Sequence, residues 1–180
     1  GENPKNIFNV GSTSVENIKN LNLYNKKEIE KKLKLKFSKE NYLVTFHPVT
    51  FKLDYGVSDF KVLLSYLSKK ANSTIIFTLP NSDTNNFKII NLIKKFVRLN
   101  KNSKYFSALG KKNYFSVIKN MDAVIGNSSS GYSEVPSFKK PTIDPGTRQK
   151  GRIAATSVIN LESVNKKNLK KAFKKINSYK

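Results

Sequence analysis

Residues 121–143 read MDAVIGNSSSGYSEVPSFKKPTI, and this stretch decides the fold that the sequence predicts. Met121–Ile125 predicts a short buried strand, Ser129–Phe138 predicts a helix, and Pro141–Ile143 predicts a second strand. Strands joined through a helix are typical of a parallel sheet, because parallel neighbours need a long crossover connection. We therefore expect an α/β protein.

The same alternation of apolar strands and amphipathic helices continues on both sides of this stretch. Tyr42–Phe46 and Ser73–Leu79 are buried-strand runs that each end at a proline turn. The order predicts a Rossmann-like, doubly wound parallel sheet with right-handed crossovers, formed by residues 1–180 as one domain. The remaining expected strands are Ile7–Val10, Lys104–Leu109 and Ser157–Leu161, and the remaining expected helices are Ser14–Leu21, Lys26–Leu35, Asp59–Lys70, Phe87–Leu99, Lys112–Lys119 and Ser163–Ser178.

The composition excludes several classes of site. The chain has 180 residues and no cysteine, which excludes disulfides, thiolate metal sites and cysteine nucleophiles. No metal-binding cluster is recognisable, and we expect neither a metal nor a cofactor. The longest apolar runs are too short to cross a bilayer, and no signal-peptide pattern opens the chain. We therefore expect a cytoplasmic protein with no membrane partner.

The net charge of +22, from 34 basic and 12 acidic residues, raises the possibility of a nucleic-acid partner. Lysine supplies nearly all of the excess, and arginine is limited to Arg98, Arg148 and Arg152. The lysines are spread over predicted helix surfaces and are not gathered around aromatic residues. We interpret them as a solvated surface without a nucleic-acid partner, and a basic nucleic-acid-binding module remains an alternative.

Polar groups follow four predicted strands, at the edge where doubly wound sheets bind ligands. The most informative group is Gly126–Gly131, GNSSSG. Its glycines allow the backbone to approach an anion, and the hydroxyls of Ser128 and Ser129 can donate hydrogen bonds. Serines that only cap the following helix are the alternative. The other three groups begin at His47, Pro80 and Asp144.

Single side chains in these groups suggest particular ligands. Arg148 offers the planar donor geometry that fits a phosphate, and Glu134 suits a sugar diol such as ribose. His47, the one histidine, can act in acid–base chemistry or bind phosphate. Asn81 and Asp83 lie in a turn, where such residues also serve conformation alone. The sequence offers no complete catalytic set, so it predicts a protein that binds a nucleoside diphosphate and lacks its reaction partner.

Four strings resemble the hydrolysing UDP-N-acetylglucosamine 2-epimerases: IFNVGS (7–12), HPVT (47–50), LPNSD (79–83) and IGNSSSGYSEVPSFKKPTIDPGTRQKGR (125–152). The resemblance implies a GT-B fold of two Rossmann-like domains, of which this chain would be the C-terminal one, with the N-terminal domain absent. It also implies that His47 assists the departure of UDP. The positions that it implies contact UDP or a UDP-N-acetyl sugar are His47, Asn81, Ser128, Ser129, Glu134 and Arg148.

The reaction implied by the resemblance eliminates UDP across C1–C2 and hydrates the resulting glycal with inversion at C2. The product is free N-acetylmannosamine or a related sugar for sialic-acid-type biosynthesis. The proton-transferring carboxylates would lie in the N-terminal domain, so the chain alone is expected to be inactive and the full-length protein to be a homo-oligomer. Asp144-Pro145 departs from the family pattern and places a carboxylate near the site. The nucleotide-binding domain of a GT-B glycosyltransferase remains an alternative.

Overall fold

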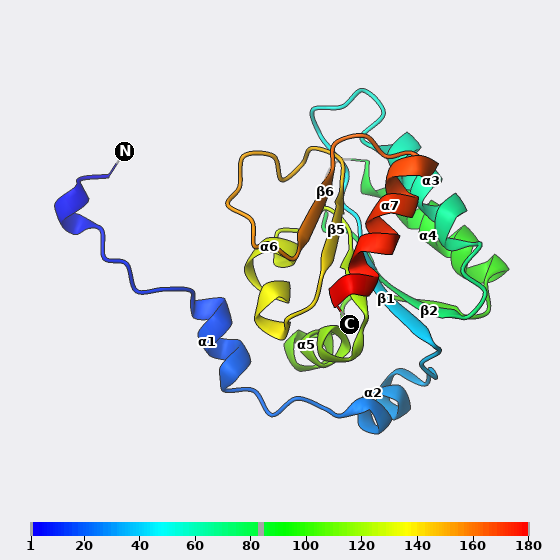
Figure 1. Cartoon of the computed structure of the whole chain (residues 1–180), viewed down its shortest axis with the longest axis horizontal. Coiled ribbons are helices and arrows are strands. Elements are labelled where there is room, and N and C mark those ends of the chain that lie inside the picture. The colour runs from blue at the N-terminus through cyan, green and yellow to red at the C-terminus, as the bar shows by residue number, and fades with distance from the viewer. Residues whose placement is uncertain (1, 83–84, 180) are drawn as a thin grey trace.

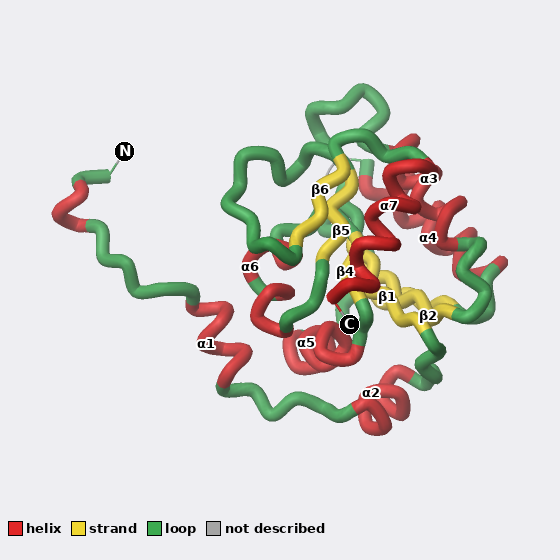
Figure 2. Tube along the Cα trace, viewed as in Figure 1, coloured by secondary structure: helices red, strands yellow, loops and turns green. Residues whose placement is uncertain are grey.

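A six-stranded parallel sheet forms the centre of the computed structural model, which describes residues 2–82 and 85–179 (Figure 1). The strand order is β3–β2–β1–β4–β5–β6, and it reverses direction between β1 and β4 (Figure 2). This order confirms the Rossmann-like, doubly wound fold. The strands are β1 (Glu40–Thr45), β2 (Ser73–Thr78), β3 (Ser103–Phe106), β4 (Ala123–Ile125), β5 (Thr142–Pro145) and β6 (Val158–Leu161).

Helices cover both faces of the sheet, with α3, α4 and α7 on one face and α2 and α5 on the other (Figure 1). Successive side chains of a strand point to opposite faces of the sheet. Tyr42 and Val44 therefore pack on the side of α3, α4 and α7, and Leu43 packs on the side of α2 and α5. Burial on both faces explains why the central strands are continuous apolar runs. The helices are α1 (Thr13–Lys19), α2 (Lys26–Leu33), α3 (Val57–Leu67), α4 (Asn86–Leu99), α5 (Lys111–Asn120), α6 (Ser130–Ser133) and α7 (Lys166–Ile176), with 3-10 turns η1 (Pro4–Asn6), η2 (Val135–Phe138) and η3 (Asn177–Tyr179).

Two sequence predictions of secondary structure are wrong. Ile7–Val10 is not a strand but part of an extended arm that leaves the sheet, with Phe8 78% and Val10 83% exposed (Figure 1). A short run with three apolar residues does not specify a pairing partner, and the arm lies away from the sheet (Figure 1). The helix predicted over Ser129–Phe138 is divided into α6 and η2. Pro136 causes the break, because it has no N–H for the α-helical ladder.

The turn after β4 requires a glycine. Gly126 has φ of +145°, and a Cβ at this position would lie 1.8 Å from the carbonyl oxygen of Thr45 at the end of β1. The amide of Gly126 donates to the carbonyl of Ile143 in β5. The missing side chain therefore lets three central strands come together where the strand order reverses.

A buried carboxylate lies in β5. Asp144 is fully buried, and its Oδ2 accepts hydrogen bonds from the Tyr132 hydroxyl (2.6 Å) and the Asn160 amide (3.0 Å). Among the described residues, its Oδ1 has no hydrogen-bond partner. Burial raises the pKa of Asp144 to about 6, because desolvation disfavours the charged form.

Within residues 2–82 and 85–179, no helix combines the length and apolar character needed to cross a membrane.

Replacing Gly126 with alanine should strongly destabilise the fold, because the new Cβ would meet backbone that cannot move without separating β1 from β4. We expect the free energy of unfolding to fall by about 3 kcal/mol or more, measured by denaturant titration. Gly151→Ala is the control, since its φ is +86° but no atom lies within 4 Å of the added Cβ. The control should lose only about 1 kcal/mol. Equal losses in the two variants would contradict the steric argument.

Stability should fall as pH rises through the range in which Asp144 titrates. The folded chain holds this proton up to about pH 6, whereas the usual pKa is 3.8, so stability is lost between these values. The free energy of unfolding should fall by about 3 kcal/mol over this range, and this fall should be absent in Asp144→Asn. Denaturant unfolding at a series of pH values from 3.5 to 8 measures it.

Asp54→Asn is the control, and it should leave the fall in stability between pH 4 and 6 unchanged. Hydrogen bonds from the Ser58 hydroxyl and amide lower the pKa of Asp54 to about 2, so its stabilising effect is lost only below pH 3.8. A wild-type profile that is flat between pH 4 and 6 would contradict the role of Asp144.

Candidate functional site

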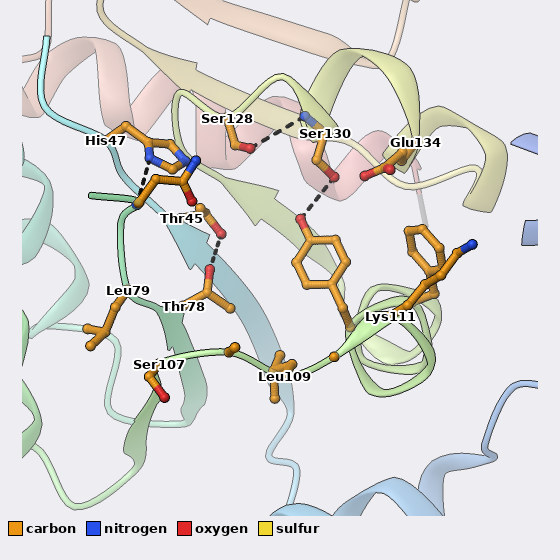
Figure 3. A pocket seen from close by; sticks show the side chains of 15 residues that line it. Thr45, His47, Thr78, Leu79, Ser107, Leu109, Lys111, Ser128, Ser130 and Glu134 are labelled. Carbon is orange, nitrogen blue, oxygen red and sulfur yellow. Dashed lines mark hydrogen bonds between the residues drawn. The ribbon is translucent and has the colours of Figure 1, made fainter. Parts of the chain in front are cut away.

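A cavity of about 430 Å³ opens at the carboxyl ends of β1, β2 and β3, beside the point where the strand order reverses (Figure 3). Segments far apart in the sequence line it: the ends of β1 and β2, the loop after β3, the first turns of α5, and the serine loop, by which we mean residues 126–130. Parallel topology brings these segments together, because it places all carboxyl ends of the strands at one edge.

Most of the side chains that the sequence predicts to be functional line the cavity. These are the histidine after β1, the asparagine after β2, the first serine of the serine loop and the glutamate between α6 and η2. Asp83 lies outside the described residues. The predicted residues that line the cavity are His47, Asn81, Ser128 and Glu134.

The other two predicted residues do not line the cavity. Ser129 is exposed at the start of α6, and its carbonyl oxygen accepts a hydrogen bond from the Ser133 hydroxyl (3.1 Å). Arg148 lies behind the serine loop, where its Nη1 donates to the carbonyl oxygen of Asn127 (3.1 Å). The positive charge of Arg148 is therefore beside the backbone of the loop, and contact with UDP stays a prediction for all six residues.

His47 is buried at the end of β1 and is held through both its backbone and its ring. Its Nδ1 accepts a hydrogen bond from the backbone N–H of Asn81 at 3.4 Å (Figure 3). Its backbone N–H and carbonyl both bond to the side chain of Asn127. These contacts fix the histidine at the wall of the cavity.

The serine loop presents Ser128 and Ser130 to the cavity (Figure 3). The Ser130 amide donates to the Ser128 hydroxyl (3.4 Å), and the Ser130 hydroxyl accepts from the Tyr114 hydroxyl (2.9 Å). The helix that follows has only four residues, so its dipole adds little attraction for an anion. The loop itself, with its amides and hydroxyls, supplies the polar surface.

Further hydroxyls occupy the floor of the cavity. Thr45 and Thr78, at the ends of β1 and β2, share a hydrogen bond between their hydroxyls (Figure 3). Burial raises the pKa of the Tyr114 hydroxyl, which therefore remains protonated at neutral pH and able to donate. Leu79 and Leu109 add an apolar side. The cavity thus combines apolar surface with a few directed polar groups, as small-molecule sites do.

Sequence reasoning missed Tyr114, Ser130 and Asn127. Tyr114 lies in an amphipathic helix, where an aromatic residue is interpreted as core, and only the three-dimensional fold reveals its partner on the serine loop. Ser130 directly follows Ser128 and Ser129, the two serines that the sequence predicts to contact UDP. Asn127 was visible within GNSSSG, but its bonds to a strand 80 residues away were not. No cluster of histidine and carboxylate groups able to hold a metal occurs in the part of the chain that the structure describes.

Comparison with known proteins identifies relatives along the entire chain. Residues 1–180 match the family described as UDP-N-acetylglucosamine 2-epimerase. A GDP/UDP-N,N'-diacetylbacillosamine 2-epimerase (hydrolyzing) of Campylobacter jejuni is 42% identical over 179 residues, which are 99% of this chain and 46% of the relative. The polysialic acid biosynthesis protein P7 of Escherichia coli is 39% identical, covering 89% of this chain and 41% of the relative. The chain spans less than half the length of these two relatives.

Solved structures share the fold at low sequence identity. A UDP co-structure of MnaA from S. aureus has a TM-score of 0.69 at 16% identity, covering 98% of this chain and 46% of that one. The C-terminal domain of a group 1 glycosyltransferase from Francisella tularensis has a TM-score of 0.54 at 15% identity, covering 83% of this chain and 80% of that one. These likenesses establish the fold as a Rossmann-like half of the GT-B type. The chain belongs to the UDP-N-acetylglucosamine 2-epimerase family and corresponds to the C-terminal half of its hydrolysing members.

Proposed function

We propose that this chain is the UDP-binding half of a hydrolysing 2-epimerase that acts on a UDP-N-acetyl sugar. One observation carries the proposal: His47, Asn81, Ser128 and Glu134 meet in one cavity beside the reversal of strand order. They come from separate segments, so a purely structural role would not require them to converge. The cavity has the size and mixed polarity of a small-ligand site.

The cavity suggests how UDP is held. The diphosphate lies against the serine loop, where Ser128 and the backbone amides donate and the cation of Arg148 lies behind the loop. Glu134 accepts hydrogen bonds from the ribose hydroxyls, which avoids placing its carboxylate beside a phosphate. Leu79 and Leu109 contact the uracil on the apolar side of the cavity.

In the proposed reaction, a proton leaves C2 of the sugar and the bond between C1 and the diphosphate oxygen breaks. Its electron pair leaves with UDP, and a C1–C2 double bond forms in the glycal. Water then adds across this double bond, with hydroxyl at C1 and a proton on the opposite face of C2. The serine loop and Arg148 stabilise the charge of the departing diphosphate, and His47 assists this departure. The groups that move protons at C2 belong to the other half of the enzyme.

The proposal extends to the assembly and location of the protein. The chain supplies the nucleotide site, the N-terminal half supplies the proton-transfer groups, and the chain alone is inactive. The complete enzyme is a cytoplasmic homo-oligomer. A GT-B glycosyltransferase shares the fold, but the relatives at 42% and 39% identity are named as a hydrolysing 2-epimerase and a polysialic acid biosynthesis protein. No specific feature of the cavity favours nucleic-acid binding over UDP.

Calorimetric titration of the 180-residue chain with UDP should give saturable one-to-one binding. Loss of a charged donor in Arg148→Ala should weaken binding about tenfold or more, and loss of a neutral hydroxyl in Ser128→Ala about two- to tenfold. Arg98→Ala, which removes an exposed arginine on α4, should leave the affinity within about twofold.

Two outcomes would count against the proposal. Absence of binding at millimolar UDP by a folded chain would show that this half does not hold the nucleotide alone. Equal UDP affinity in the wild type, Arg148→Ala and Ser128→Ala would show that UDP binds elsewhere. Strong, salt-dependent RNA binding without UDP binding would instead support the nucleic-acid alternative.

A further inference from the structure

Asn127 occupies an unusual position directly behind the cavity. It follows Gly126 at the end of β4, its side chain is fully buried, and it does not line the cavity. Its Oδ1 accepts from the backbone N–H of His47 (2.7 Å), and its Nδ2 donates to the carbonyl of the same residue (2.9 Å). The side-chain amide thus satisfies both backbone groups of His47 and extends the pairing of β1 and β4 beyond the last strand residues.

The backbone carbonyl of Asn127 makes a second pair of contacts. It accepts hydrogen bonds from Nε2 of Gln149 (2.7 Å) and from Nη1 of Arg148 (3.1 Å). A carbonyl oxygen has two lone pairs, so these two donors use its full capacity. Within the described residues the Arg148 guanidinium makes no other hydrogen bond, and its positive charge partly offsets the effect of burial on the pKa of Asp144.

We propose that Asn127 is a positioning residue that sets the backbone of His47 and the guanidinium of Arg148 relative to the serine loop before a nucleotide binds. The proposal rests on the proposed function, because it concerns the same diphosphate site. A charged group that is already oriented loses less conformational entropy on binding, which increases affinity without any contact between Asn127 and the ligand. Asn127 therefore acts on the ligand only through the residues that it holds.

The chain contains a matched control for this role. Asn41 is the second residue of β1, at the amino-terminal end of the strand, and is also buried, at 6% exposed. Its Oδ1 accepts from the backbone N–H of Ser38 (2.9 Å), and its Nδ2 donates to the carbonyl of Ser38 (3.0 Å). The two asparagines therefore make the same pair of bonds to one backbone residue. Only Asn127 joins residues that we place at the nucleotide site.

The test compares UDP affinity and thermal stability in the 180-residue chain and in Asn127→Ala, Gln149→Leu and Asn41→Ala. Both asparagine variants should be less stable, because each loses two hydrogen bonds between a buried side-chain amide and the backbone. Asn127→Ala should weaken UDP binding about tenfold or more, and Gln149→Leu about threefold, whereas Asn41→Ala should stay within about twofold of the wild type. An Asn127→Ala affinity within twofold of the wild type would overturn the proposal.

A double-mutant cycle with Arg148→Ala identifies the route of the effect. If Asn127 acts through Arg148, Asn127→Ala should reduce UDP affinity clearly less in the Arg148→Ala background than in the wild type. Full additivity would overturn this coupling. Should Asn127→Ala not fold at low temperature, Gln149→Leu decides the question. It removes a donor to the same carbonyl, together with a buried oxygen that has no hydrogen-bond partner among the described residues. Unchanged UDP affinity in that variant would then overturn the proposal.

A measurement without ligand separates this proposal from the UDP assignment. In NMR spectra of the ligand-free chain, Asn127→Ala should shift the side-chain resonances of His47 and Arg148, and Asn41→Ala should leave them in place. If the wild type binds no UDP but these shifts occur, the proposed function fails and the positioning role stands. If the His47 and Arg148 resonances stay in place in Asn127→Ala, the positioning role is wrong whatever the result with UDP.

Discussion

The contact between the end of β1 and the start of the serine loop determines the rest of the site. Gly126 passes so close to the carbonyl of Thr45 that no side chain fits between them, and its amide bonds to β5 on the other side. This approach places Asn127 within reach of His47. The cavity, the serine loop and the loop that carries Arg148 are arranged around this contact, which a larger residue would force apart.

Most of the fold could be predicted from the sequence, because its strands are buried on both faces. Ser73–Leu79 and Tyr42–Phe46 are mostly apolar and buried, and the structure contains them as β2 and β1 with small shifts at their ends. Such runs have few alternatives in an α/β chain. Ile7–Val10 is shorter and includes the polar Asn9, and its pattern carries no information about pairing.

The sequence predicts only those residues of the candidate site whose position follows from the chain topology. Residues directly after strands, such as His47 and Ser128, reach the cavity because all strands end at one edge. The contact between Tyr114 and Ser130 depends on how α5 packs against α6, and that packing has no local signature. The side-chain chemistry of Arg148 predicts a ligand contact, and only the folded structure shows that its guanidinium donates to the backbone carbonyl of Asn127.

The hydroxyls on the floor of the cavity have a consequence of their own. In the pair formed by Thr45 and Thr78, either oxygen can be the donor, and a hydroxyl hydrogen changes direction by rotation about one bond. The cavity floor can therefore reverse the polarity of a hydrogen bond without displacing a heavy atom. The two hydroxyls can therefore meet either a donor or an acceptor without any motion of the backbone.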